Sequence, residues 1–123
     1  MLDINEFAKE VHQNAKDHGW WDEERSFGEI IALCHSELSE ALEEYRKGRP
    51  MIYVDDYPSL SRKERIPKLG DGEKPEGIAV ELADCIIRIL DYCGKEGIDI
   101  EAILKLKHEY NKTRPYKHGG KKI

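Results

Sequence analysis

The fold of this chain is decided by one stretch, Ile78-Ala79-Val80-Glu81-Leu82-Ala83-Asp84-Cys85-Ile86-Ile87-Arg88-Ile89-Leu90-Asp91. On a helix, its aliphatic side chains would cover nearly the whole circumference, which is typical of a buried helix. The polar exceptions recur every three or four residues, so they share one narrow stripe. They are Glu81, Asp84, Arg88 and Asp91. We therefore predict a central helix that carries a single, mainly acidic stripe.

Three more helices are predicted around the central one. Apolar residues at helical spacing predict a helix over residues 3–17. Ser26 followed by Glu29 matches a capping box and opens a helix that runs to about residue 47. Asp99 is placed to cap a last helix over residues 100–113, and Gly94 is predicted to end the central helix after residue 92. The prediction is an all-α four-helix bundle in a single domain of residues 1–123.

Residues 48–77, which join the second and third helices, read as a long loop. They contain four of the five prolines and lack helical periodicity, apart from a possible short strand at residues 52–54. Such loops are often functional or mobile in compact domains. We predict a flap near the active site, with Tyr53, Tyr57, Arg62, Lys63 and Arg65 available to a nucleotide. A tolerated surface insertion is the alternative.

Composition limits the classes of protein. With 123 residues, 39% hydrophobic and 37% charged, the chain is too apolar to be disordered and has no run that would span a membrane. Its net charge of −5 disfavours binding to a nucleic-acid polymer. Three cysteines without disulfide or zinc spacing, and a start without a signal-peptide pattern, predict a cytoplasmic protein.

Two acidic pairs with the same spacing stand out, Glu37-Leu38-Ser39-Glu40 and Glu81-Leu82-Ala83-Asp84. Residues three apart share a helix face, so each pair projects two carboxylates together from an apolar helix. Four carboxylates on two facing helices form a suitable set of ligands for a hard divalent cation. The alternative is that they are ordinary solvated residues, with Arg88 balancing Asp84 or Asp91.

The last predicted helix carries a possible phosphate site. Lys107, Asn111 and Arg114 are four and three residues apart, so they lie on one face. Two cations and an amide suit phosphate oxygens, although basic residues also favour the end of any exposed helix. Trp20 and Trp21 suit packing, but Trp21 could instead stack on a nucleobase.

At this point the chain resembles the MazG-type all-α nucleoside triphosphate pyrophosphohydrolases. The resemblance covers about residues 18–120 and rests on the two acidic pairs and on residues 107–115, Lys-His-Glu-Tyr-Asn-Lys-Thr-Arg-Pro. It implies Mg²⁺-dependent cleavage between the α and β phosphates, with Mn²⁺ as a possible substitute, by a homodimer or homotetramer. The implied metal ligands are Glu37, Glu40, Glu81 and Asp84, and the implied phosphate ligands are Lys107, Asn111 and Arg114. Glu40 is our choice of general base.

Two other functions stay open on the sequence. One is a non-catalytic helical module that binds a nucleotide or a protein and keeps the acidic pairs for structure. The other is a pyrophosphohydrolase that acts on phosphoribosyl-ATP instead of a free triphosphate. Nothing in the sequence sets the preference for base or sugar.

Overall fold

The protein forms four α-helices in a computed structural model that describes residues 2–54, 66, 69–70 and 72–116. They are α1 (Ile4–Asp17), α2 (Phe27–Arg46), α3 (Ile78–Glu96) and α4 (Ile100–Lys112). Across these residues there is no β-strand, which confirms the all-α prediction. Ser26 Oγ accepts the N–H of Glu29 at 3.1 Å and Asp99 Oδ1 accepts that of Ala102 at 3.1 Å, so both predicted caps are present.

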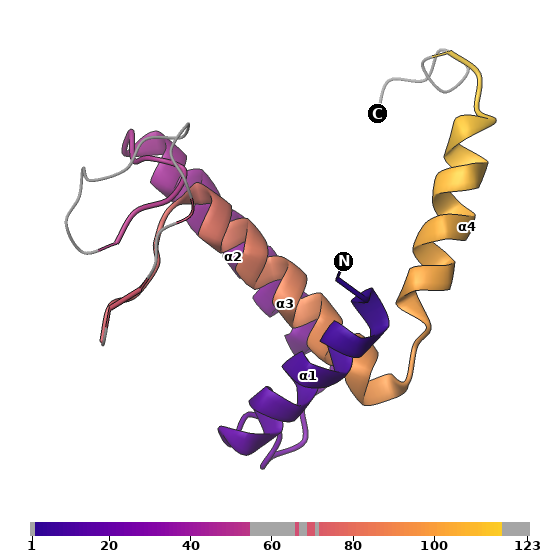
Figure 1. Cartoon of the computed structure of the whole chain (residues 1–123), viewed down its shortest axis with the longest axis horizontal. Coiled ribbons are helices and arrows are strands. Elements are labelled where there is room, and N and C mark those ends of the chain that lie inside the picture. The colour runs from indigo at the N-terminus through magenta and orange to yellow at the C-terminus, as the bar shows by residue number, and fades with distance from the viewer. Residues whose placement is uncertain (1, 55–65, 67–68, 71, 117–123) are drawn as a thin grey trace.

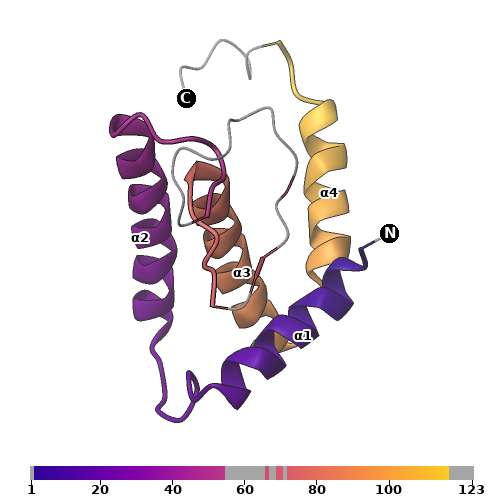
Figure 2. The ribbon, with the colours of Figure 1, turned by 60° about the vertical axis from the view of Figure 1, so that its left-hand side comes forward.

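The helices divide into a packed group and an outlying one. α2 and α3 lie side by side and antiparallel, and α1 crosses the C-terminal half of α3 (Figures 1 and 2). α4 packs chiefly against α1 and stands apart from α2 and α3 in both views. Asn5 ties α4 to α1, because its side chain donates to Asp99 Oδ1 at 2.7 Å and accepts the N–H of Glu101 at 3.1 Å. α4 itself has no buried residue.

Mostly small apolar residues make the core between α1, α2 and α3. The buried members on the helices are Ala8, Ile30, Cys34, Ala41, Ile78, Cys85, Leu90 and Cys93. Small side chains at five of these positions let the helices approach closely, and Ile30, Ile78 and Leu90 are the larger buried side chains. All three cysteines are buried free thiols. No helix among the described residues has both the length and the hydrophobicity needed to cross a bilayer.

Gly94 has a different role from the predicted one. α3 continues through it to Glu96 and ends at Gly97, whose φ of 68° is the left-handed conformation typical of a helix C-terminus. The prediction that Gly94 ends the helix is therefore wrong. A Cβ at Gly94 would lie 2.5 Å from the carbonyl oxygen of Ala8, so a glycine here allows α1 to cross α3 closely.

The two ends of the 48–77 segment are fastened to each other. Tyr53 and Glu76 exchange backbone hydrogen bonds of 2.8 Å in each direction, which makes an isolated bridge in place of the predicted short strand. Tyr53 is only 5% exposed and its hydroxyl donates to Glu44 Oε1 at 2.7 Å, so this ring is packed away from an incoming base. The flap prediction falls mostly outside the described residues, as do Tyr57, Arg62, Lys63 and Arg65.

One face of the α2–α3 pair is apolar and exposed in the part of the chain that the structure describes. Its large exposed side chains include Ile31, Leu38, Leu42, Tyr45, Leu82, Ile86 and Ile89. Leu42 follows Glu40 by two residues and Ile86 follows Asp84 by two, which places them on nearly opposite sides of their helices from these acids. Ile86 is 56% exposed. Within the described part of one chain, α3 is therefore buried on one side only, and not all round as predicted.

Replacing Gly94 with alanine is expected to destabilise the fold. The new methyl group would press on the α1 backbone, and overpacking of this kind costs about 1–3 kcal/mol, which exceeds the gain in helix propensity of about 1 kcal/mol. Gly28→Ala is the matched control, since Gly28 is helical and nothing lies within 4 Å of an added Cβ. Urea unfolding measures both, and equal stability of the two variants would contradict the close crossing.

Candidate metal centre

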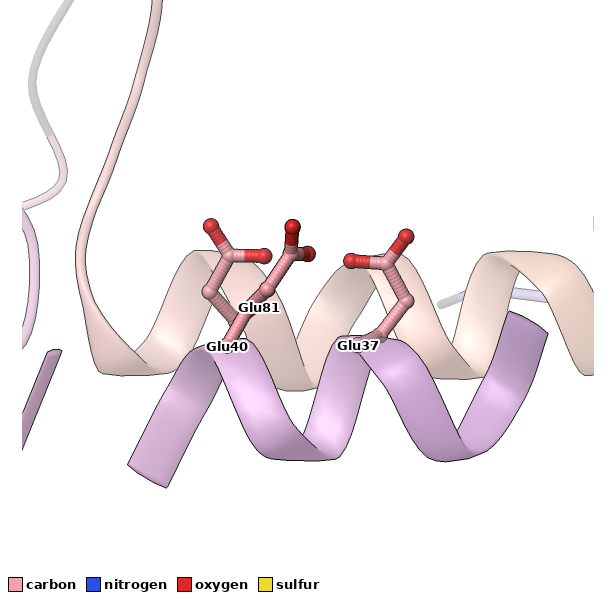
Figure 3. Close-up of side chains that lie close together, drawn as sticks. All are labelled: Glu37, Glu40 and Glu81. Atoms are coloured by element: carbon pink, nitrogen blue, oxygen red, sulfur yellow. The ribbon is translucent and has the colours of Figure 1, made fainter. Parts of the chain in front are cut away.

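Three of the four predicted carboxylates meet on one face of the α2–α3 pair. Glu37 and Glu40 project from α2 and Glu81 from α3, and all three point to the same side (Figure 3). One oxygen from each lies within 4.8 Å of the others. Asp84, one turn beyond Glu81, is half-buried and lies outside this group of three, but it lines the same cavity as Glu37. Side chains from the two helices thus form a compact cluster of carboxylates.

Glu37 is the buried member, at 6% exposure, and it has a cationic partner. Arg88 Nε donates to Glu37 Oε1 at 2.8 Å. Burial opposes ionisation of Glu37, but hydrogen bonds from Glu40 and Arg88, together with the charge of Arg88, hold its pKa below the ordinary value. Glu37 therefore carries the most firmly ionised carboxylate of the centre.

The other carboxylates resist ionisation. Burial, a hydrogen bond with Glu37 and the charges of Glu40 and Asp84 raise the pKa of Glu81 to about 7. A hydrogen bond with Glu37, followed by burial, raises the pKa of Glu40. Burial and the charge of Glu37 raise the pKa of Asp84 against the lowering effect of Arg88. Part of the negative charge of the centre is thus neutralised by protons near neutral pH.

A hard divalent cation fits this arrangement. Mg²⁺ and Mn²⁺ prefer carboxylate oxygens, and the centre offers three within 4.8 Å from two rigid helices. Burial of Glu81 and the close contact of Glu40 with Glu37 raise the pKa of these two carboxyl groups, and a bound cation would relieve the same repulsion that the protons relieve. The residues therefore fit a divalent metal, without selecting one ion.

A cavity of about 610 Å³ adjoins the centre. Glu37, Asp84 and Arg88 form one wall, and one face of α1 forms another with Phe7, Glu10, Val11, Asn14 and Ala15, next to His18 at the end of the helix. Trp20, Ile87 and Asp91 complete the lining. The volume falls in the range of small-molecule pockets, and the lining combines apolar side chains with charged and polar groups that can fix the orientation of a ligand.

Trp20, rather than Trp21, lines this cavity. Trp21 donates its indole N–H to the buried Asp91, with Nε1 3.0 Å from Oδ1, and His12 Nδ1 is 2.8 Å from the same oxygen. Asp91 thereby fastens α1 and the turn after it to α3. Trp21 is half-buried, and its predicted stacking on a base stays a prediction.

The predicted phosphate residues lie on α4 and just after its end, apart from the metal centre. Lys107 Nζ is 4.8 Å and Arg114 Cζ 5.8 Å from the centre of the Tyr110 ring, so these cations gather over one tyrosine. Asn111 follows Tyr110 on the same helix. The opposite side pairs its own charges, Lys105 with Glu101 and Lys112 with Glu109. α4 packs chiefly against α1, so its own chain does not bring this side onto α2 or α3.

The sequence did not predict the partners of Arg88 and Asp91. Both belong to the polar stripe of α3, and the sequence suggested only that Arg88 balances Asp84 or Asp91. Arg88 instead pairs with Glu37 on the neighbouring helix, and Asp91 binds His12 and Trp21. The signal was their spacing on an apolar helix, but a helical wheel does not reveal partners on another helix.

The chain matches no protein-family model, no curated protein and no solved structure.

Stability of the metal-free protein is expected to fall as pH rises from about 4.5 to about 7. The folded state holds the Glu81 proton with a pKa of about 7 against an ordinary value of 4.5. The stabilisation by this proton is therefore complete below the lower value and lost as pH rises through the upper one. With solvent screening at this half-exposed residue, the effect amounts to about 1 kcal/mol.

Glu81→Gln should remove this part of the pH dependence, because glutamine stays neutral throughout. Urea unfolding in chelator at pH 5 and pH 7.5 gives the change in unfolding free energy for each protein. Glu43→Gln is the control, since Glu43 is an exposed residue of α2 outside the carboxylate cluster. Its Oε1 lies 4.0 Å from Lys47 Nζ. The same pH dependence in wild type and Glu81→Gln would contradict the crowded centre.

Proposed function

We propose that this protein is a Mg²⁺-dependent nucleoside triphosphate pyrophosphohydrolase that cleaves between the α and β phosphates, releasing a nucleoside monophosphate and pyrophosphate. One observation carries the proposal. Three carboxylates from two helices lie within 4.8 Å, next to a cavity of about 610 Å³. A divalent-cation site beside a space for a small molecule is what metal-assisted phosphate hydrolysis requires. The MazG-type resemblance of the two acidic pairs supports the same reaction.

Each carboxylate has a role in this proposal. When bound, Mg²⁺ would neutralise phosphate charge and lower the pKa of its bound water. Glu37, Glu40 and Glu81 would hold the ion from the two helices, with Asp84 beside them as the fourth predicted ligand. Glu40 is the exposed member, within reach of solvent, and its raised pKa suits a group that accepts a proton from an attacking water. The products leave without any covalent intermediate on the protein.

We place the phosphate-binding residues across a subunit interface. Lys107 and Asn111 lie on α4 and Arg114 follows its end, and α4 stands apart from the α2 and α3 helices that carry the carboxylates (Figure 1). The α2–α3 pair also has one apolar face that is exposed among the described residues, and patches of this kind mark contacts with other molecules. A homodimer or homotetramer would cover that face, and α4 of one copy would reach the carboxylates of another.

Pyrophosphate release from a panel of substrates tests the reaction and its alternatives. The panel contains the ribo- and deoxyribonucleoside triphosphates, and phosphoribosyl-ATP. Release from triphosphates with Mg²⁺ supports the proposal, and release from phosphoribosyl-ATP alone would replace it with the related activity. Binding without release from any substrate would leave a non-catalytic module.

Loss of Glu81 is expected to abolish pyrophosphate release. Glu81→Ala removes one of the three converging carboxylates, so the rate should fall by at least a hundredfold, or about 2.7 kcal/mol. Asp84→Ala should act in the same direction, and Glu43→Ala should leave the rate unchanged. Circular dichroism checks that the helices persist. Near-normal turnover by folded Glu81→Ala would show that the metal centre is not the site of reaction.

A mixture of two inactive variants is expected to recover activity if α4 acts on a second copy. Glu81→Gln damages the carboxylates and Arg114→Ala damages the phosphate side, so a mixed dimer holds one site with both parts intact. Random mixing would restore about a quarter of the wild-type sites in a dimer. Glu81→Gln mixed with Glu37→Gln is the control, because both lesions fall in the same half of the site.

Native mass spectrometry establishes that mixed oligomers have formed. Mixed oligomers without recovered activity would show that α4 of one copy does not act at the metal centre of another. Recovery of activity in the control mixture would also contradict this arrangement.

A further inference from the structure

Arg88 is a cation built into the wall of the metal centre. It follows Asp84 by one helical turn on α3, and its Nε donates to the buried Glu37 at 2.8 Å. The guanidinium carbon also lies 5.0 Å from the centre of the Trp20 ring. Arg88 lines the cavity beside Glu37 and Asp84. The only cation in contact with the described carboxylate cluster therefore faces the space that a substrate would occupy.

Most of the hydrogen-bonding capacity of Arg88 is unused. A guanidinium carries several N–H groups in a planar fork that matches carboxylate or phosphate oxygens. Within the described part of the chain, Glu37 is the one acceptor that Arg88 has. Among the described residues, the remaining N–H groups therefore meet no acceptor at the edge of the cavity, where they can meet an anion.

Arg88 and a divalent cation would compete for the same carboxylate. Glu37 is only 6% exposed, and a buried carboxylate needs a positive partner. Arg88 fills that need in this structure. A cation at the cluster would replace Arg88 as the positive partner of Glu37. The guanidinium would then be free to leave this ion pair, while Arg88 keeps its position on α3.

We propose that Arg88 is an anion-binding residue that pairs with Glu37 in the metal-free protein and, once a divalent cation occupies the cluster, binds a phosphate oxygen of a ligand in the cavity. The ligand class is an inorganic or organic pyrophosphate, since these anions bind both divalent cations and arginine. This deepens the proposed function, on which its identification of the ligand rests. It also gives the cavity a phosphate-binding group from the same chain as the carboxylates.

The matched control is Arg25. Its guanidinium also lies over Trp20, at 3.6 Å, but its hydrogen bonds go to the Trp20 carbonyl and to Glu29 rather than to the metal centre. A loss of Trp20 stacking therefore affects Arg25→Ala and Arg88→Ala alike. A loss of the group beside Glu37 affects Arg88→Ala alone.

Two binding experiments on the full chain test the proposal. The first titrates Mn²⁺ and follows its electron paramagnetic resonance signal. Arg88→Ala should bind Mn²⁺ at least as tightly as wild type, because a competing cation is gone. The second titrates inorganic pyrophosphate calorimetrically with Mn²⁺ saturating. Here Arg88→Ala should bind about thirtyfold more weakly than wild type, whereas Arg25→Ala should bind as wild type does. Arg88→Lys keeps the charge without the fork and should lie between them.

A merely structural ion pair would behave differently. It would lower the melting temperature and the Mn²⁺ affinity of Arg88→Ala together, and pyrophosphate binding to the Mn²⁺-loaded Arg88→Lys would match wild type. Either result overturns the proposal, as does a wild-type protein that binds no pyrophosphate with Mn²⁺ present. Both titrations are independent of turnover. A protein that hydrolyses no triphosphate but shows the expected Arg88 effect would overturn the proposed function and leave this inference standing.

Discussion

Repulsion between carboxylates held on packed helices is the constraint around which the centre of this protein is organised. Side chains on a flexible loop could separate, but Glu37, Glu40 and Glu81 are fixed by the contact between α2 and α3. The molecule reduces the repulsion locally with Arg88 against Glu37 and with retained protons on Glu81. A sequence selected for stability alone would be expected to place apolar groups here, because replacing buried ionic groups is often neutral or stabilising.

The packing that holds these acids depends on small residues at the helix crossings. Ala8 and Gly94 let α1 meet α3 at backbone distance, and Cys34 and Ala41 sit in the contact side of α2. Close helix contacts restrict side-chain positions more tightly than a loosely packed core would. Asp91 adds a polar fastening with His12 and Trp21, at the end of α3 away from the carboxylates. The wall of the cavity formed by α1 is thereby fixed relative to the centre.

The sequence predicted the helices well because their signals are local. Capping by Ser26 and Asp99 and the apolar periodicity are properties of neighbouring residues, and the structure has both caps. The shared face of each acidic pair was also local, and three of the four carboxylates do converge. Gly94 misled the prediction because a glycine that allows a close crossing looks the same in sequence as one that ends a helix. The partners of Arg88 and Asp91 lie on other helices, which local spacing does not encode.

Asn5 has a consequence for the geometry of α4. One amide joins the first turn of α1 to the first turn of α4, through Asp99 and the backbone of Glu101. Because α4 has no buried residue of its own, this junction acts as the pivot of a rod whose thirteen residues extend about 20 Å. A rotation of a few degrees at the pivot moves the far end, where Asn111 lies, by more than an ångström. The position of the basic side chains near the end of α4 thus depends on Asn5, an uncharged residue that contacts the first turn of the helix.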